Sequence, residues 1–152
     1  MVSLKFSLRH AQADMVFKKS LIFFNKNIHL LKLILLYVMA LLFVLAGINH
    51  FWHPKTYLRI MPPYLPMPQL LNYVSGIAEI TLGIMLCFKA TQKLAAWSIA
   101  IMLVLFFAVH IYMLQQSLNK APFALSPAMA WGRLLVQPLL IAWALWYTKV
   151  NV

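Results

Sequence analysis

The residues best suited to chemistry in this sequence are polar side chains set inside long apolar runs. Glu79 lies near the middle of the apolar stretch 68–88 and is one of only two acidic residues in the chain. A charged side chain at the bilayer centre costs about 2.5–3.5 kcal/mol on insertion scales, so such a residue normally faces a protein interior and has a partner. Glu79 is therefore the first candidate for a functional residue.

Other polar groups fall where helical spacing places them near Glu79. Asn72, Ser75 and Glu79 are spaced i, i+3 and i+7, which puts them on one face of a helix. Arg133 and Gln137 lie one helical turn apart in a later apolar run. We expect Glu79 and Arg133 to form a buried charge pair, with the neighbouring polar groups as its hydrogen-bond partners.

Two further runs carry polar groups at the same side of the membrane. Asn49 and His50 end the first apolar run, and His110 lies in the outer third of another. The sequence therefore predicts a polar cavity open to the outside or to the outer leaflet, built from Glu79, Arg133, Gln137, His110, Asn72, His50, Asn49 and Ser75. The alternative is that these groups only hold the helices in register, through interhelical hydrogen bonds of about 0.6 kcal/mol each.

Cofactor chemistry is only weakly indicated. His50 and His110 could ligate a b-type haem, but two candidate ligands alone are a weak signal, so haem is not expected. No metal site is predicted, because Glu79 is the only acidic residue within an apolar run and Cys87 is the only cysteine. A quinone is the cofactor that the residues allow, with Glu79 or His110 taking up a proton and Arg133 or Gln137 donating to a carbonyl oxygen.

The elements that position these residues are membrane-spanning helices. Of the 152 residues, 64% are hydrophobic, against about 45–50% in soluble domains. About 20 apolar residues, at about 1.5 Å each, cross a hydrocarbon core of about 30 Å. The chain is long enough for four such spans, which we place at residues 30–51, 68–88, 94–114 and 128–147.

These spans predict an all-α, polytopic integral membrane protein built as a four-helix transmembrane bundle. The bundle is expected at residues 28–149, after a basic N-terminal arm at 1–27 that is partly disordered or interfacial. Gly76 and Gly83 share the face of Glu79, and this small face suits close helix contact. The prolines between 54 and 68 predict an extended or turning cover over the helix ends. Tyr57 and the tryptophans are interpreted as interfacial belts.

Charge sets the expected orientation and partners. The net charge of +11 arises from 13 basic and 2 acidic residues. Because the basic residues flank apolar runs, lipid headgroups explain them better than nucleic acid does, and no nucleic-acid partner is expected. The N-terminal arm, Lys89, Lys93 and Lys149 share the more basic face, which the positive-inside rule places in the cytoplasm. We predict a multi-pass protein of a bacterial inner membrane, in contact with the lipid bilayer, with both termini cytoplasmic.

Five short motifs occur in order along the chain: AGINHFWHP at 46–54, IMPPYLPMP at 60–68, SGIAEITLG at 75–83, HIYM at 110–113 and RLLVQPLLIAWA at 133–144. The combination resembles the DoxX-like family of small four-helix bacterial membrane proteins, over residues 35–149. The resemblance implies a four-helix bundle with a polar outer cavity built by Glu79, Arg133 and Gln137. Close relatives in that family commonly carry asparagine in place of His110.

Two functions of different classes stay open. The DoxX-like family is named after a subunit of a thiosulfate:quinone oxidoreductase, so the resemblance favours a quinone-linked or redox-associated membrane subunit that needs a redox partner protein. The alternative is a non-enzymatic assembly factor or a binding protein for a lipid or small molecule. Because the chain shows no complete catalytic motif, an enzyme is expected only as a subunit of a membrane oxidoreductase. A transporter is disfavoured, since no inverted repeat is visible.

Overall fold

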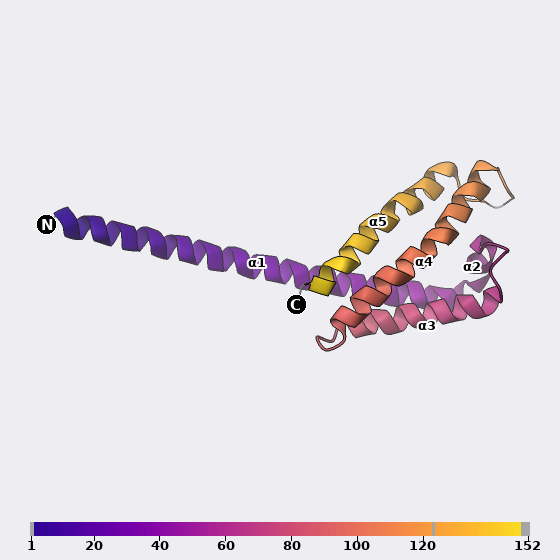
Figure 1. The fold of residues 1–152 in the computed structure, drawn as a ribbon, viewed down its shortest axis with the longest axis horizontal. Coiled ribbons are helices and arrows are strands. Elements are labelled where there is room, and N and C mark those ends of the chain that lie inside the picture. The colour runs from indigo at the N-terminus through magenta and orange to yellow at the C-terminus, as the bar shows by residue number, and fades with distance from the viewer. Residues whose placement is uncertain (1, 123, 150–152) are drawn as a thin grey trace. The chain divides into compact units, whose positions relative to one another are not determined.

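The computed structural model describes residues 2–122 and 124–149, and within these residues it contains five helices and no strand. The helices are α1 (Val2–Trp52), α2 (Pro54–Ile60), α3 (Pro68–Leu86), α4 (Gln92–Leu118) and α5 (Pro127–Lys149) (Figure 1). The predicted all-α class is confirmed.

Four stretches of the described chain are long and apolar enough to cross a membrane: residues 17–52 of α1, and helices α3, α4 and α5. The protein is therefore a multi-pass helical membrane protein. Large apolar side chains such as Leu105 and Leu139 are 68% and 69% exposed, as lipid-facing residues are. The predicted spans agree with these helices except at the start of the chain, where α1 is continuous from Val2 instead of following a partly disordered arm.

The chain divides into two compact units, residues 2–35 and residues 36–149. The first unit is the helical N-terminal part of α1. The second unit contains the rest of α1 and all of the other helices, and it carries every residue of the site described below.

Prolines begin three of the helices. Pro54, Pro68 and Pro127 are the first residues of α2, α3 and α5, a position where the missing N–H has no intrahelical partner and the fixed φ suits the helix. The prediction of an extended or turning segment throughout residues 54–68 was therefore wrong in its first half. Pro54 starts a helix there, and only the part beyond Ile60 turns.

Glycines bring α1 and α3 together, backbone against backbone. A Cβ atom at Gly47 would lie 2.6 Å from the carbonyl oxygen of Gly76, and one at Gly83 would lie 2.8 Å from the carbonyl oxygen of Ala40. The predicted close contact on the small face of α3 is confirmed, and α1 is the helix that it meets. This contact places the end of α1 directly beside the polar face of α3.

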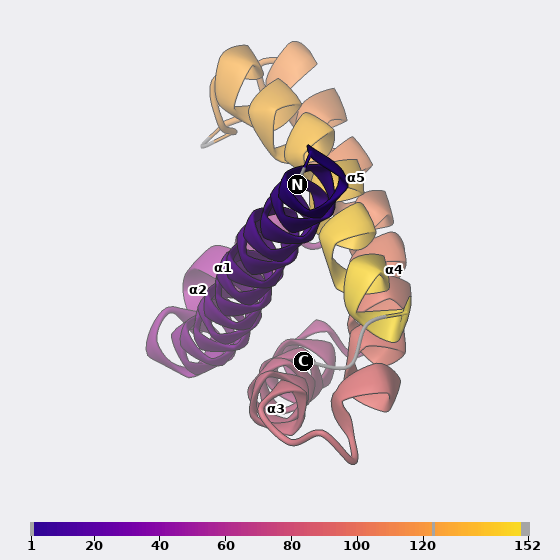
Figure 2. The same ribbon diagram turned by 90° about the vertical axis from the view of Figure 1, so that its left-hand side faces the viewer.

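Helices α4 and α5 form a second closely packed pair, lying side by side in both views (Figures 1 and 2). Both helices carry small buried residues, Ala96 and Ala100 on α4 and Ala130 and Ala144 on α5. Between helices in lipid, such small side chains allow the close van der Waals packing that drives association. Helix α3 also packs on α4, which joins the two pairs into one bundle.

Candidate ligand-binding cavity

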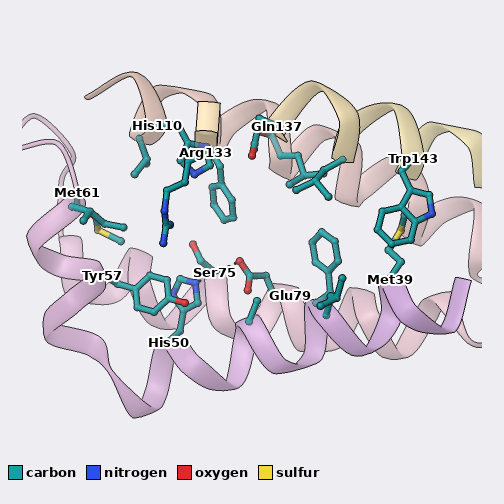
Figure 3. Close-up of a pocket in the computed structure, with 18 residues that line it drawn as sticks. Met39, His50, Tyr57, Met61, Ser75, Glu79, His110, Arg133, Gln137 and Trp143 are labelled. Carbon is teal, nitrogen blue, oxygen red and sulfur yellow. Dashed lines mark hydrogen bonds and ion pairs between the residues drawn. The ribbon is translucent and has the colours of Figure 1, made fainter. Parts of the chain in front are cut away.

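A cavity of about 320 Å³ lies inside the bundle, with α1 and α3 on one side, α4 and α5 on the other and α2 at one end (Figure 3). Most of its wall is apolar, formed by Met39, Leu42, Phe43, Ala46, Ile60, Met61, Leu103, Phe106, Val109, Leu140 and Trp143. The polar part of the wall consists of His50, Tyr57, Ser75, Glu79, His110, Arg133 and Gln137. Figure 3 shows Met39 and Trp143 at the end away from α2, so the cavity has a polar end and an apolar end.

Glu79 is buried at the polar end, with 4% of its surface exposed. Its Oε1 lies 3.5 Å from Nε2 of His50, whereas its Oε2 has no hydrogen-bond partner among the described residues. The sequence predicted Arg133 as the partner of Glu79, and the structure gives it His50 instead. The reason is the contact between α1 and α3, which brings His50 against Glu79 while Arg133 stands across the cavity on α5.

Asn72 fixes the protonation of the His50 ring. The Asn72 Nδ2 donates to the carbonyl oxygen of His50 at 3.1 Å, which leaves Asn72 Oδ1 as an acceptor, 2.9 Å from His50 Nδ1. His50 Nδ1 must therefore carry a proton. The other ring nitrogen, Nε2, faces Oε1 of Glu79 at 3.5 Å.

Tyr57 covers this pair from α2. Its ring stacks on His50 with 3.7 Å between ring centroids, and its hydroxyl oxygen accepts a hydrogen bond from Asn49 Nδ2 at 2.9 Å. His53 Nδ1 lies 2.8 Å from Oδ1 of the same Asn49 side chain. Burial raises the pKa of the Tyr57 phenol above its ordinary value. The Tyr57 hydroxyl thus keeps its proton at neutral pH and can donate it into the cavity.

Helix α5 supplies two polar residues that differ in their surroundings. Gln137 is 2% exposed, and its Nε2 donates to the carbonyl oxygen of Leu103 on α4 at 2.7 Å, so it links the two helices across the cavity wall. Arg133 is exposed and extends into the cavity towards α1 and α3 (Figure 3). Its guanidinium group forms no hydrogen bond or ion pair with any other residue that the structure describes.

Six of the eight residues singled out in the sequence line this one cavity, including Ser75 on α3 and His110 on α4. The ring nitrogen Nδ1 of His110 is buried without a hydrogen-bond partner in the described part of the chain. Asn72 and Asn49 lie outside the wall and act through His50 and Tyr57. No group of three or more potential metal-ligating side chains occurs within residues 2–122 and 124–149.

Sequence reasoning missed Tyr57, which it assigned to an interfacial belt. Helix α1 ends at Trp52 and α2 begins at Pro54, so helical spacing does not relate Tyr57 to Asn49 or His50 across this break. The contact of Tyr57 with both residues depends on how α2 folds back, which the sequence does not show.

A family model described as "Domain of unknown function (DUF8561)" matches residues 39–148. No curated protein and no solved structure matches the chain. The expectation of a DoxX-like protein was therefore wrong, because the family model that matches is a different one. All cavity residues, from Met39 to Trp143, lie inside the matched region. The chain belongs to the DUF8561 family, whose function is undefined.

Proposed function

We propose that the protein binds an amphipathic small molecule in its intramembrane cavity and has no catalytic role of its own. The observation that carries this proposal is the Oε2 atom of Glu79, which is buried, faces the cavity and has no partner among the described residues. A buried polar atom left without a partner costs about 1–3 kcal/mol, and more if it is charged. A bound molecule with a hydrogen-bond donor would remove that cost.

The size and polarity of the cavity support the same proposal. Its volume of about 320 Å³ falls within the range of about 300–1,000 Å³ that small-molecule sites occupy. Donors and acceptors gather at one end, around Glu79 and Tyr57, while Met39 and Trp143 form the other end. A molecule with a polar head and an apolar body fits this division.

A binding role explains these features better than a redox subunit does. The redox interpretation depended mainly on the resemblance to DoxX-like proteins, and the chain belongs to another family. A quinone is still one member of the proposed ligand class, because Tyr57 and Arg133 can both donate hydrogen bonds to carbonyl oxygens. The identity of the bound molecule therefore distinguishes the two functions.

We also propose a location, a bacterial plasma membrane with both termini in the cytoplasm. The support is the excess of basic residues on the face that carries the N-terminal arm, Lys89, Lys93 and Lys149. In this orientation α2 and the polar end of the cavity lie towards the outer side.

The test is extraction with organic solvent and mass spectrometry of the protein purified in mild detergent. The wild type is compared with Glu79→Gln and with Asp14→Asn, which removes the only other carboxylate side chain. We expect one amphipathic species in about equimolar amount in the wild type and in Asp14→Asn, and much less in Glu79→Gln. Only ordinary bilayer phospholipid, at one level in all three samples, would contradict the proposal. A quinone as the species would restore the redox interpretation.

A further inference from the structure

We propose that the head of this ligand is an oxyanion, a carboxylate or a phosphate, held by Arg133 at the mouth of the cavity. The inference rests on the proposed function and names the chemical class of its ligand, a single-chain amphiphile with an anionic end. Three observations carry it: the pairing of Glu79 with His50, the surroundings of Arg133 and the shape of the opening.

The acidic side chain of the cavity wall has its partner on α1. Oε1 of Glu79 lies 3.5 Å from Nε2 of His50, so Glu79 is not paired with Arg133. The positive charge of Arg133 is therefore left for the head of a bound molecule. An anionic head complements this charge, whereas a cationic head does not.

The surroundings of Arg133 call for a negative partner. Arg133 is six residues from the first residue of α5, which places it about 9 Å along a membrane-spanning helix. It is exposed there and has no ion-pair partner in the described part of the chain. An unpaired charge within the bilayer is costly. A guanidinium group binds carboxylate or phosphate through two parallel hydrogen bonds, which makes an oxyanion its best-matched partner.

The opening of the cavity lies at the same residue. A groove on the surface of α5 shares four wall residues with the cavity, namely His110, Arg133, Gln137 and Leu140. The groove continues past Gly132, where an added Cβ would meet nothing within 4 Å. Arg133 thus stands where the inner cavity meets the outer groove. An acyl chain in the apolar end would leave its head at Arg133, with the Tyr57 hydroxyl as a second donor. A hydroxyl group beside the oxyanion, or a protonated phosphate oxygen, would supply the donor that Oε2 of Glu79 lacks.

The test is a titration of the full-length, delipidated protein in mild detergent, followed by native mass spectrometry. The probes share one chain: oleate, oleoyl lysophosphatidate and the uncharged oleyl alcohol. We expect one molecule bound per chain, with both anions binding about 10- to 100-fold more tightly than the alcohol, as expected for a charge-assisted hydrogen bond. The tighter of the two anions indicates whether a free carboxylate or a phosphate monoester is the natural head, and either supports the proposal.

Variants assign the preference to one residue. Arg133→Gln should bind both anions as weakly as the alcohol, and its unchanged binding of the alcohol shows that the cavity is intact. Arg133→Lys should keep most of the preference for anions. The matched control is Arg59→Gln, which makes the same change at an exposed arginine of α2 that does not line the cavity, and it should behave as the wild type.

The two proposals fail in distinguishable ways. If the wild type binds acid and alcohol equally, or if the preference for anions survives in Arg133→Gln, the oxyanion assignment is overturned while the cavity remains a binding site. If no probe binds at one molecule per chain, the proposed function fails and the assignment of the head fails with it.

Discussion

Replacing Gly47 with alanine tests how α1 and α3 position the site. The new Cβ would lie 2.6 Å from the carbonyl oxygen of Gly76 and 2.9 Å from the backbone nitrogen of Ile80. Both are backbone atoms, so no side-chain rotation can relieve the overlap. Ordinary van der Waals contact begins at 3.4 Å, and the two helices must therefore separate by about 0.8 Å at this point.

The expected loss of stability in Gly47→Ala follows from a comparison with Gly132, a glycine without close neighbours. Overpacking costs about 1–3 kcal/mol, and glycine to alanine in a helix interior gains up to about 1 kcal/mol. Gly132 receives the same helical gain, but its added Cβ meets nothing within 4 Å. The difference between Gly47→Ala and Gly132→Ala thus isolates the packing cost, and we expect Gly47→Ala to be the less stable by about 1–3 kcal/mol.

The assay is unfolding in mixed micelles by titration with sodium dodecyl sulfate, followed by circular dichroism. Organic extraction of the same samples reports on the site, because His50 and Glu79 separate when α1 moves from α3. We expect the bound amphiphile to be lost from Gly47→Ala. Equal stability of the two variants would refute the reasoning, since the backbones of α1 and α3 could not then be in contact at Gly47.

Three other outcomes are expected. Asn72→Leu removes both hydrogen bonds to His50 and leaves a buried ring N–H without a partner, which should lower the free energy of unfolding by about 1–3 kcal/mol; unchanged stability would remove the structural role of Asn72. Because burial raises the pKa of Tyr57, this phenol ionises at a lower pH in the unfolded chain than in the folded protein. The contribution of Tyr57 to stability is therefore complete below about pH 10 and is lost as the pH rises further. An ultraviolet titration of the wild type, compared with Tyr57→Phe, should show one phenol that ionises at a higher pH than a free tyrosine. Ionisation of this phenol at the pH of a free tyrosine would exclude the effect of burial. A reporter fused after Val152 should be active only in the cytoplasm, and activity on the opposite side would reverse the orientation.

Local features of the sequence were enough to predict the class of fold. The four spans follow from hydropathy, which depends only on neighbouring residues. The shared face of Asn72, Ser75 and Glu79 follows from the helical repeat in the same way. These three residues do lie on one side of α3, in or directly behind the cavity wall.

The partner of Glu79 could not be obtained in this way, because it depends on which helices are neighbours. The sequence showed a small face around Gly76 but not the helix that this face meets. Once Gly47 is known to contact Gly76, His50, three residues later on α1, becomes the group nearest to Glu79. Arg133 carries the more obvious opposite charge. Helix α5, however, packs on α4, and the cavity separates Arg133 from Glu79.

Helix α2 was missed for a different reason. Proline ends a helix when it lies in the interior but favours one when it comes first, and the sequence around Pro54 does not state which position it has. The five short motifs did not identify the family, because the family model that matches residues 39–148 is a different one.

The short distance between His50 and Glu79 has a consequence for the response of the protein to membrane voltage. A proton that passed from one group to the other would move one charge by less than the 3.5 Å that separates Nε2 from Oε1. A full charge crossing the bilayer gains about 2.3 kcal/mol per 100 mV, and 3.5 Å is roughly a tenth of a core about 30 Å thick. Such a transfer would therefore be worth at most about 0.3 kcal/mol per 100 mV. The membrane potential thus has almost no influence on how charge is divided between these two side chains.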